Sequence, residues 1–368
     1  MADLLDYVLW RGDVEFSYSP FNEIDALIFS ELSYLDFKGL VDSGFEKKIA
    51  LSELAKKFQT AGDFSSRIKL GPLINAKAVD LLFAVGKAKR FSEVFVTGYR
   101  SHLDYEKEEQ FAALVFLFAK KNALVVFRGT DDTILGWKED FNMAFLDSLP
   151  SQNDGLAYAK KAMEIFRWKQ FYFAGHSKGG NIAIFAAASI EKKFEKRIKT
   201  IYNFDGPGFP ENIFLRNEFQ NAFAKTKSFY PKLSIVGMLF ERGKNYKIVE
   251  CEKAGLMEHD PFMWNVVGNT FLFADEFDKA SILFHETFNE WFRNASVDEK
   301  RESVETLFRV LGSADVKTNS ELSKRWFTST VKMIYSLATL DKKSRDMLTK
   351  TLQIFVSNWL EAKQKMSK

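Results

Sequence analysis

A serine lies between two glycines in the segment Gly175-His-Ser-Lys-Gly179. An aromatic run typical of a strand precedes it at 171–173, and a good helix former follows it at 182–188. Between a strand and a helix, G-x-S-x-G is typical of a sharp turn that lifts the serine hydroxyl clear of the sheet, with glycines where side chains would collide. We predict that Ser177 is a nucleophile; the alternative is a glycine-rich turn without chemistry.

A serine hydroxyl needs a neighbouring base to take its proton, and the chain has four histidines. His259 lies in a loop after the last expected strand, and a triad in the order Ser…Asp…His requires a late histidine. We therefore predict that His259 is the base, the alternative being a surface histidine. His176 is expected to point away from the nucleophile and to pack, and His102 and His285 are weaker candidates.

The acid of such a triad is expected at the carboxyl edge of the sheet. Asp205 directly follows the apolar strand expected at 201–204 and precedes Gly-Pro-Gly. There it can orient the imidazole and stabilise its cationic form. The alternative for Asp205 is an aspartate that caps a turn. Asp260, which is adjacent to His259, and Glu241 are weaker candidates.

An oxyanion hole needs donors that are fixed before the charge develops. One is expected to be the backbone N–H of Lys178, directly after the nucleophile. The other is expected from the loop after the strand at 123–127, where Thr130 offers its hydroxyl and its backbone N–H. The alternative is an ordinary polar turn with Arg128 in a structural ion pair.

Composition restricts the setting of this chemistry. The chain has 368 residues, is 46% hydrophobic with 38 Phe, and carries a net charge of only +3, so neither nucleic acid nor an anionic membrane is expected as an obligatory partner. No run of about 18 apolar residues predicts a membrane-spanning helix, and the acidic N-terminus is unlike a secretory signal. Cys251 is the single cysteine, which fits a cytoplasmic protein. No metal or organic cofactor is implied.

The elements that must position these residues follow an α/β pattern. Helix spacing is found at 25–34, 51–58 and 76–87. Strands are expected at 94–99, 111–118 and 123–127, the last two joined as a hairpin, and then helices and strands alternate. The last strands are expected at 233–239 and 247–251. We predict a mainly parallel sheet flanked by helices, with an antiparallel leading edge.

The pattern divides the chain into three parts. We expect a mainly helical segment packed on the core at 1–90, the α/β core at 91–275 and a helical region at 276–368. Three apolar stripes mark that last region as helical packing surfaces. They comprise Val304, Leu307, Phe308 and Leu311; Leu322, Trp326, Met333 and Leu337; and Leu348, Leu352, Phe355 and Trp359.

Several of these motifs together resemble the class 3 (fungal-type) lipases of the α/β-hydrolase fold. The resemblance lies in Phe127-Arg-Gly-Thr130, Trp137, Asp140 and the later Gly-His-Ser-Lys-Gly-Gly, and it covers about residues 90–265. It implies that Thr130 is the oxyanion-hole residue, Ser177 the nucleophile and His259 the base. The whole chain, including Trp10-Arg-Gly-Asp13, resembles a bacterial family of lipase-related hydrolases.

The sequence departs from the lipase pattern at two positions. Class 3 lipases carry the triad aspartate after the next strand, where this chain has Ser234. Pancreatic-type lipases place theirs one strand earlier, in a position similar to that of Asp205, so the resemblance carries the acid role to Asp205. Lys178 replaces an apolar residue; we expect its side chain to face solvent, the alternative being recognition of an anionic substrate.

The expected activity is hydrolysis of a carboxylic ester, the substrate being a small acyl or lipid compound, through an acyl-enzyme on Ser177. The choice of an ester comes from the resemblance, because the motif alone is equally compatible with amides and thioesters. The alternative is a catalytically inactive binding or scaffolding module with the same fold. That module would have Asp205 turned away from His259.

Overall fold

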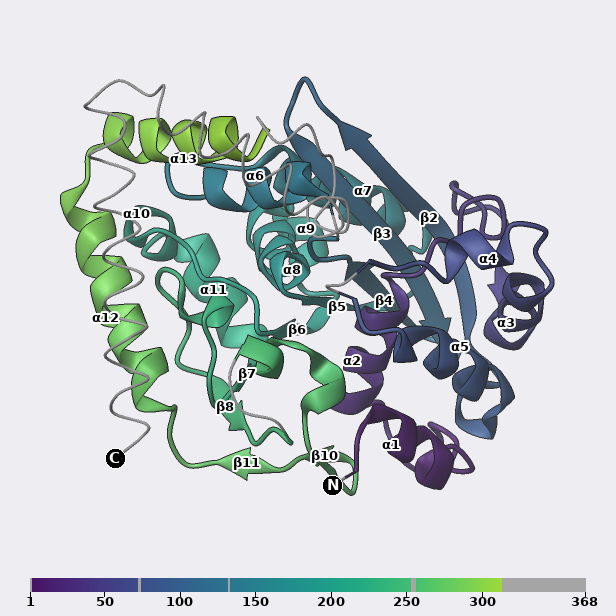
Figure 1. The fold of residues 1–368 in the computed structure, drawn as a ribbon. Coiled ribbons are helices and arrows are strands. Elements are labelled where there is room, and N and C mark those ends of the chain that lie inside the picture. The colour runs from purple at the N-terminus through teal and green to yellow at the C-terminus, as the bar shows by residue number, and fades with distance from the viewer. Residues whose placement is uncertain (1, 72–73, 132, 253–255, 313–368) are drawn as a thin grey trace.

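A nine-stranded mixed sheet forms the centre of the protein (Figure 1). The computed structural model describes residues 2–71, 74–131, 133–252 and 256–312. The strand order is β1-β2-β3-β4-β5-β6-β7-β8-β11. Strands β1 to β4 are antiparallel, β4 to β8 run parallel, and β11 pairs antiparallel with β8. The predicted antiparallel leading edge and the parallel strands that follow it are confirmed, although the sheet as a whole is mixed rather than mainly parallel.

The strands and helices have the following bounds. The sheet comprises β1 (Ile49–Ala50), β2 (Phe95–Asp104), β3 (Glu109–Phe118), β4 (Asn122–Phe127), β5 (Gln170–His176), β6 (Ile198–Phe204), β7 (Thr226–Pro231), β8 (Tyr246–Val249) and β11 (Phe273–Ala274), and β9 (Val266–Val267) pairs with β10 (Thr270–Phe271). The helices are α1 (Leu4–Arg11), α2 (Glu23–Leu32), α3 (Leu51–Gln59), α4 (Phe64–Arg67), α5 (Lys77–Lys87), α6 (Ile134–Asn142), α7 (Pro150–Ile165), α8 (Lys178–Ser189), α9 (Lys192–Glu195), α10 (Glu211–Phe214), α11 (Asn217–Lys225), α12 (Lys279–Asn294) and α13 (Val297–Gly312). Short 3₁₀ helices are η1 (Lys89–Phe91), η2 (Val236–Met238), η3 (Leu256–His259) and η4 (Pro261–Met263).

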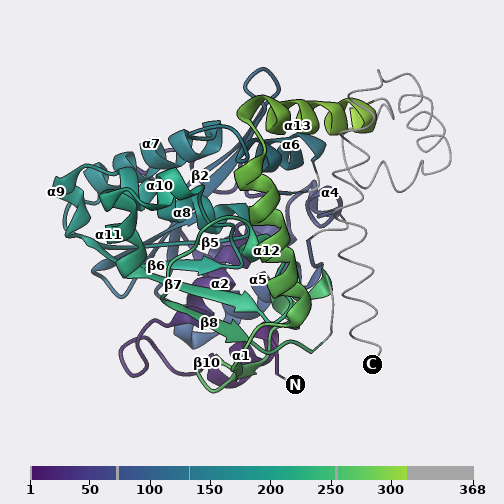
Figure 2. The same cartoon turned by 90° about the vertical axis from the view of Figure 1, so that its left-hand side faces the viewer.

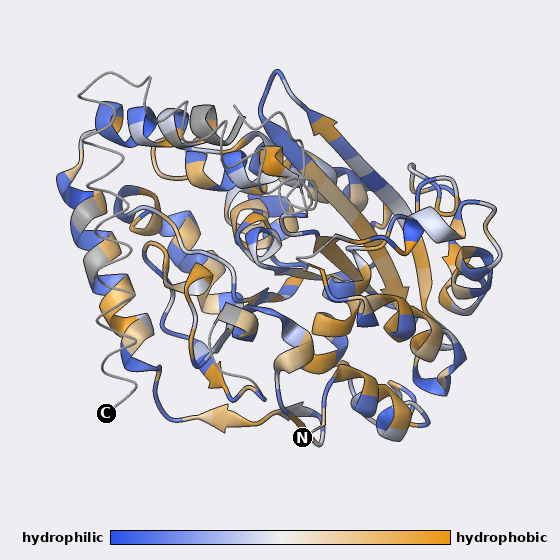
Figure 3. Cartoon of the chain, in the orientation of Figure 1, coloured by the Kyte–Doolittle hydropathy of each residue, from blue (hydrophilic) through white to orange (hydrophobic). Residues whose placement is uncertain are grey.

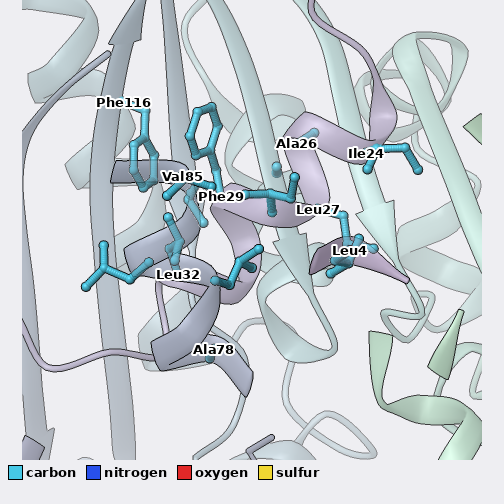
Figure 4. Close-up of a cluster of buried hydrophobic side chains, with 14 of the residues drawn as sticks. Leu4, Ile24, Ala26, Leu27, Phe29, Leu32, Ala78, Val85 and Phe116 are labelled. Carbon is cyan, nitrogen blue, oxygen red and sulfur yellow. The ribbon is translucent and has the colours of Figure 1, made fainter. Parts of the chain in front are cut away.

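Both faces of the sheet are covered, which explains why its strands are apolar on both sides. On β3, Leu114 and Phe116 point into a core shared with α1, α2, α3 and α5, whereas Ala113 and Val115 point into a second core shared with α7, α8 and α11. Figure 3 shows hydrophobic residues concentrated on the central strands and on the N-terminal helices. In Figure 4, Phe29 of α2 lies beside Phe116, their rings stacked with centroids 4.3 Å apart.

The start of α2 is set by its cap. Asn22 accepts hydrogen bonds from the backbone N–H groups of Ile24 and Asp25, and Asp25 accepts one from the Asn22 N–H in return. This reciprocal capping box satisfies N–H groups that have no partner within the helix. The helix begins two residues before the apolar spacing suggested.

A buried ion pair joins the N-terminal helices to the segment leading into β2. Arg90 donates to both carboxylate oxygens of Asp25 at 2.7 and 2.5 Å, and both side chains are fully buried. Tyr7 of α1 donates to the same carboxylate at 3.1 Å. Two parallel N–H···O bonds of this kind hold the guanidinium and the carboxylate in one relative orientation and also pair their charges.

One expected strand is wrong. The apolar run at 233–239 forms a turn and η2. The strand that neighbours β6 is β7, which begins with the polar run 226–228 and becomes apolar only at 229–231. The run at 233–239 is apolar because it fills the space beside the sheet: Met238 packs with Tyr230, Ile248 and Phe277. Burial between a sheet and a helix produces an apolar run as readily as strand pairing does.

The last described helices lie against the core of the molecule. Figure 1 and Figure 2 both show α13 lying along α6, and the rings of Phe141 and Phe308 meet there with centroids 5.7 Å apart. Val304 and Phe308, from the first predicted stripe, are buried. The stripes at 322–337 and 348–359 lie outside the described residues. Within the described part of the chain, every helix is too short or too polar to cross a bilayer.

The buried pair yields a stability prediction. Replacing Asp25 with Asn leaves the Arg90 guanidinium buried without a compensating charge, so we expect the free energy of unfolding to fall by about 3–5 kcal/mol in urea denaturation. The matched control is Glu53→Gln, which breaks the exposed pair with Lys57 and is expected to change little. Equal effects of the two substitutions would contradict this account.

Candidate functional site

Ser177 occupies a sharp turn between β5 and α8, as its flanking sequence predicts. Its backbone has φ 56° and ψ −134°, a combination that costs free energy for a residue with a side chain. The two glycines are required by contact: a Cβ on Gly175 would lie 2.1 Å from the backbone carbon of Gly179, and one on Gly179 would lie 2.1 Å from the Phe127 oxygen. The turn therefore forms with Ser177 at its tip.

His259 and Asp205 are in direct contact. The His259 Nδ1 atom donates to Asp205 Oδ2 at 2.6 Å; the aspartate is fully buried, and the histidine side chain is 33% exposed. Ser177 donates its backbone N–H to the Phe204 carbonyl at 2.9 Å, so Ser177 and Asp205 follow the ends of two neighbouring strands. Among the hydrogen bonds of the described residues, none joins the Ser177 hydroxyl to the His259 ring.

Ser234, at the position where class 3 lipases carry their acid, supports Asp205. Its hydroxyl donates to Asp205 Oδ1 at 2.5 Å. Each carboxylate oxygen of Asp205 thus accepts one hydrogen bond. The space around this carboxylate is tight, because a Cβ on Gly237 would lie 2.5 Å from the same oxygen. The sequence marks Ser234 as a departure, but nothing in it indicates this contact.

His176 is buried, as expected, and it positions the loop that carries His259. Its Nε2 atom donates to the backbone carbonyl of His259 at 2.9 Å, and the Tyr34 hydroxyl donates to its Nδ1 atom at 3.0 Å. Burial lowers the pKa of His176 well below its usual value, so the ring is neutral and carries its proton on Nε2. The hydrogen bond from His176 therefore holds the main chain at His259, the candidate base.

Thr130 lies in the loop after β4, close to the serine turn. The neighbouring Gly129 approaches so closely that a Cβ there would lie 3.1 Å from the Ser177 Cβ. The Thr130 hydroxyl donates to Asp140 Oδ2 of α6 at 2.5 Å, and burial raises the pKa of Asp140 to about 6. Arg128 pairs with Asp131 at 3.1 Å, as the alternative interpretation of this loop expected.

The Lys178 side chain is buried, so the expectation that it faces solvent is wrong. Its Nζ atom lies 2.8 Å from Glu139 Oε2 and also donates to the carbonyl and side-chain oxygens of Gln110 at 3.0 and 3.1 Å. Glu139 accepts further hydrogen bonds from the backbone N–H groups of Gln110 and Ser151. Lys178 therefore ties the serine turn to β3 and to α6. A charge this well paired in the folded chain also argues against recognition of an anionic substrate.

The weaker candidates lie in other surroundings. Asp260 accepts a hydrogen bond from Asn75 at 2.7 Å, and Glu241 pairs with Arg293 at 3.1 Å. His285 donates to the Met238 carbonyl at 2.7 Å. His102 lies on β2 between the carboxylates of Glu109 and Asp154.

Comparison with known proteins identifies the family. Residues 85–309 match the Mbeg1-like family, and the chain belongs to it. A search of curated protein sequences finds no significant match.

Solved structures of fungal proteins show distant likeness. A mutant form of MDLA from Penicillium cyclopium is 12% identical, over 68% of this chain and 83% of its own, with a TM-score of 0.38. The Rhizomucor miehei lipase propeptide complex is 15% identical, over 62% of this chain and 68% of its own, with a TM-score of 0.34. Lipase II from Rhizopus niveus is 15% identical, over 68% of this chain and 94% of its own, with a TM-score of 0.32.

The buried lysine can be tested by a double-mutant cycle. Lys178→Met leaves the Glu139 carboxylate buried without its cation, so we expect the free energy of unfolding to fall by about 3–5 kcal/mol. Adding Glu139→Gln removes the stranded charge and is expected to recover part of that loss. Lys193→Met, at an exposed lysine, is the control. Losses that simply add in the double variant would contradict the pairing.

The raised pKa of Asp140 predicts a pH dependence of stability. An aspartate that holds its proton more tightly when folded contributes stability in full below about pH 4, and loses it as the pH rises through about 6. Asp140→Asn does not titrate. Because the Asp140 side chain is 30% exposed, we expect the free energy of unfolding of the wild type, relative to the variant, to fall by about 1–2 kcal/mol between about pH 4 and 7. A constant difference across this range would contradict the assignment.

Proposed function

We propose that this protein is a serine hydrolase of the α/β-hydrolase type that cleaves a carboxylic ester through an acyl-enzyme. The single observation that carries the proposal is the 2.6 Å contact between His259 Nδ1 and Asp205, formed beside the strained Ser177 turn. With Nδ1 engaged, the Nε2 atom of His259 is the nitrogen left to act as a base. In proteins without a substrate, the bond from base to nucleophile is often long or poorly aligned.

The proposed reaction follows from these positions. Ser177 Oγ attacks the carbonyl carbon while His259 Nε2 takes its proton, and buried Asp205 stabilises the imidazolium that forms. The imidazolium then gives the proton to the departing alcohol. Water, deprotonated by the same histidine, attacks the acyl-enzyme. The bond to Ser177 Oγ then breaks, the histidine returns the proton to Oγ, and the acid is released.

The oxyanion is proposed to be stabilised by backbone N–H groups. Lys178 begins α8, so its N–H lies at the positive end of the helix dipole. The single hydroxyl proton of Thr130 is engaged by Asp140, which leaves the Thr130 backbone N–H as the second donor. Fixed donors of this kind are worth roughly 10²–10³ in rate each.

An apolar acyl group is the substrate class that the surroundings favour. Trp137 and Phe141 on α6, and Met257, two residues before His259 on η3, are partly exposed, at 41%, 39% and 55%. Trp137 and Phe141 share α6 with Asp140, and Met257 shares η3 with His259. The ester bond itself is inferred from the resemblance of the motifs. The alternative of an inactive module expected Asp205 to point away from His259, and the contact between them counts against it.

The proposal is tested by labelling with a fluorophosphonate probe together with hydrolysis of a p-nitrophenyl ester series of increasing chain length. We expect the wild type to be labelled and Ser177→Ala not to be. Asp205→Asn is expected to reduce turnover by about 10⁴. Ser189→Ala, on the exposed end of the same helix, is the control and is expected to retain both activities. Folded wild type that neither labels nor turns over would contradict the proposal.

A further inference from the structure

Three side chains that commonly bind metals converge outside the candidate active site. His102 comes from β2, Glu109 from the start of β3 and Asp154 from α7. The His102 Nε2 atom lies 3.5 Å from Glu109 Oε1 and 3.4 Å from Asp154 Oδ2. All three ligand atoms lie within 4.8 Å of one another.

One oxygen of the buried member of this group lacks a hydrogen-bond partner within the described part of the chain. Glu109 is only 1% exposed, and its Oε1 atom, the one that faces His102, accepts no hydrogen bond from any described residue. Leaving a buried carboxylate oxygen unsatisfied is costly, and native structures usually explain such an atom by a water or an ion. The unpartnered oxygen therefore points to a cation at this position.

The spacing distinguishes between kinds of cation. For bond lengths of 2.0–2.1 Å, two ligands of a tetrahedral zinc ion lie about 3.3 Å apart. Adjacent ligands of an octahedral magnesium ion would lie about 2.9 Å apart. The two distances from His102 are close to the tetrahedral value, and the two carboxylate oxygens lie within 4.8 Å of each other. The ligand type carries the choice, because imidazole is suited to zinc rather than to magnesium or calcium.

We propose that His102, Glu109 and Asp154 bind a divalent transition-metal ion of the zinc type. The two carboxylates balance its charge, and a water can occupy the fourth position. His102 and Asp154 are 42% and 46% exposed, which provides a path of entry from solvent. The site is separate from Ser177, His259 and Asp205, and the proposal does not depend on the hydrolytic function.

Such an ion would be structural. It would tie α7 to both strands of the β2–β3 hairpin. Glu109 is followed by Gln110, whose carbonyl oxygen accepts a hydrogen bond from Lys178. Metal binding would therefore stabilise the end of β3 that holds the buried lysine. The competing interpretation is a protonated His102 that pairs with both carboxylates without a metal.

The test is titration of the full chain, freed of metal by a chelator, with ZnCl₂ in a calorimeter. We expect one ion per chain to bind at this site, and His102→Ala and Asp154→Asn each to weaken binding by about tenfold or more. Both residues are partly exposed, so these variants are expected to fold, which circular dichroism checks. Glu106→Gln, in the exposed turn of the same hairpin, is the matched control for loss of a negative charge.

Two further measurements separate this site from binding elsewhere. His259→Ala is expected to retain zinc binding, because the active-site histidine is not a ligand. Saturating zinc is expected to raise the Tm of the wild type but not that of His102→Ala, since a ligand stabilises only the state that binds it. A wild type that binds no zinc, as the protonated pair predicts, or a His102→Ala variant that binds it equally tightly, would overturn the proposal.

Discussion

The arrangement of the candidate site depends on one buried carboxylate. Asp205 directly follows β6, has no exposure to solvent, and makes one contact through each oxygen, to His259 and to Ser234. A buried charge is tolerated only when its hydrogen bonds are satisfied, so these two contacts must form together with the fold. Because one of them is to the histidine, the same constraint that stabilises Asp205 also fixes the imidazole.

A second layer of contacts extends from this carboxylate to distant parts of the chain. His176 holds the His259 main chain and is itself held by Tyr34, just after α2. At the start of α8, Lys178 links this helix to Glu139 of α6. The N-terminal helices and α6 therefore belong to the support of the site. The division of the chain near residues 90 and 275 stays a prediction.

The sequence predicted those features that local chemistry determines. The turn at Ser177 follows from glycines between a strand and a helix, and Asp205 could be placed because residues at the ends of neighbouring parallel strands share an edge. Contacts between distant segments left no such signal. The bond from Ser234, the pairing of Lys178 with Glu139 and the role of His176 each depend on how separate elements pack. The strand expected at 233–239 was wrong for the same reason. Burial against α12 and pairing in a sheet both favour apolar residues, so the sequence does not distinguish them.

Hydrolysis by this protein requires the Ser177 oxygen to meet the His259 imidazole beside a prepared oxyanion site. The most direct measurement is a crystal structure of the protein after reaction with a p-nitrophenyl phosphonate. We expect phosphorus bonded to Ser177 Oγ, its oxygen accepting hydrogen bonds from the backbone N–H groups of Thr130 and Lys178, and His259 Nε2 within about 3 Å of an adduct oxygen. Phosphorus on another residue, or a His259 ring out of hydrogen-bonding reach of the adduct, would contradict the account.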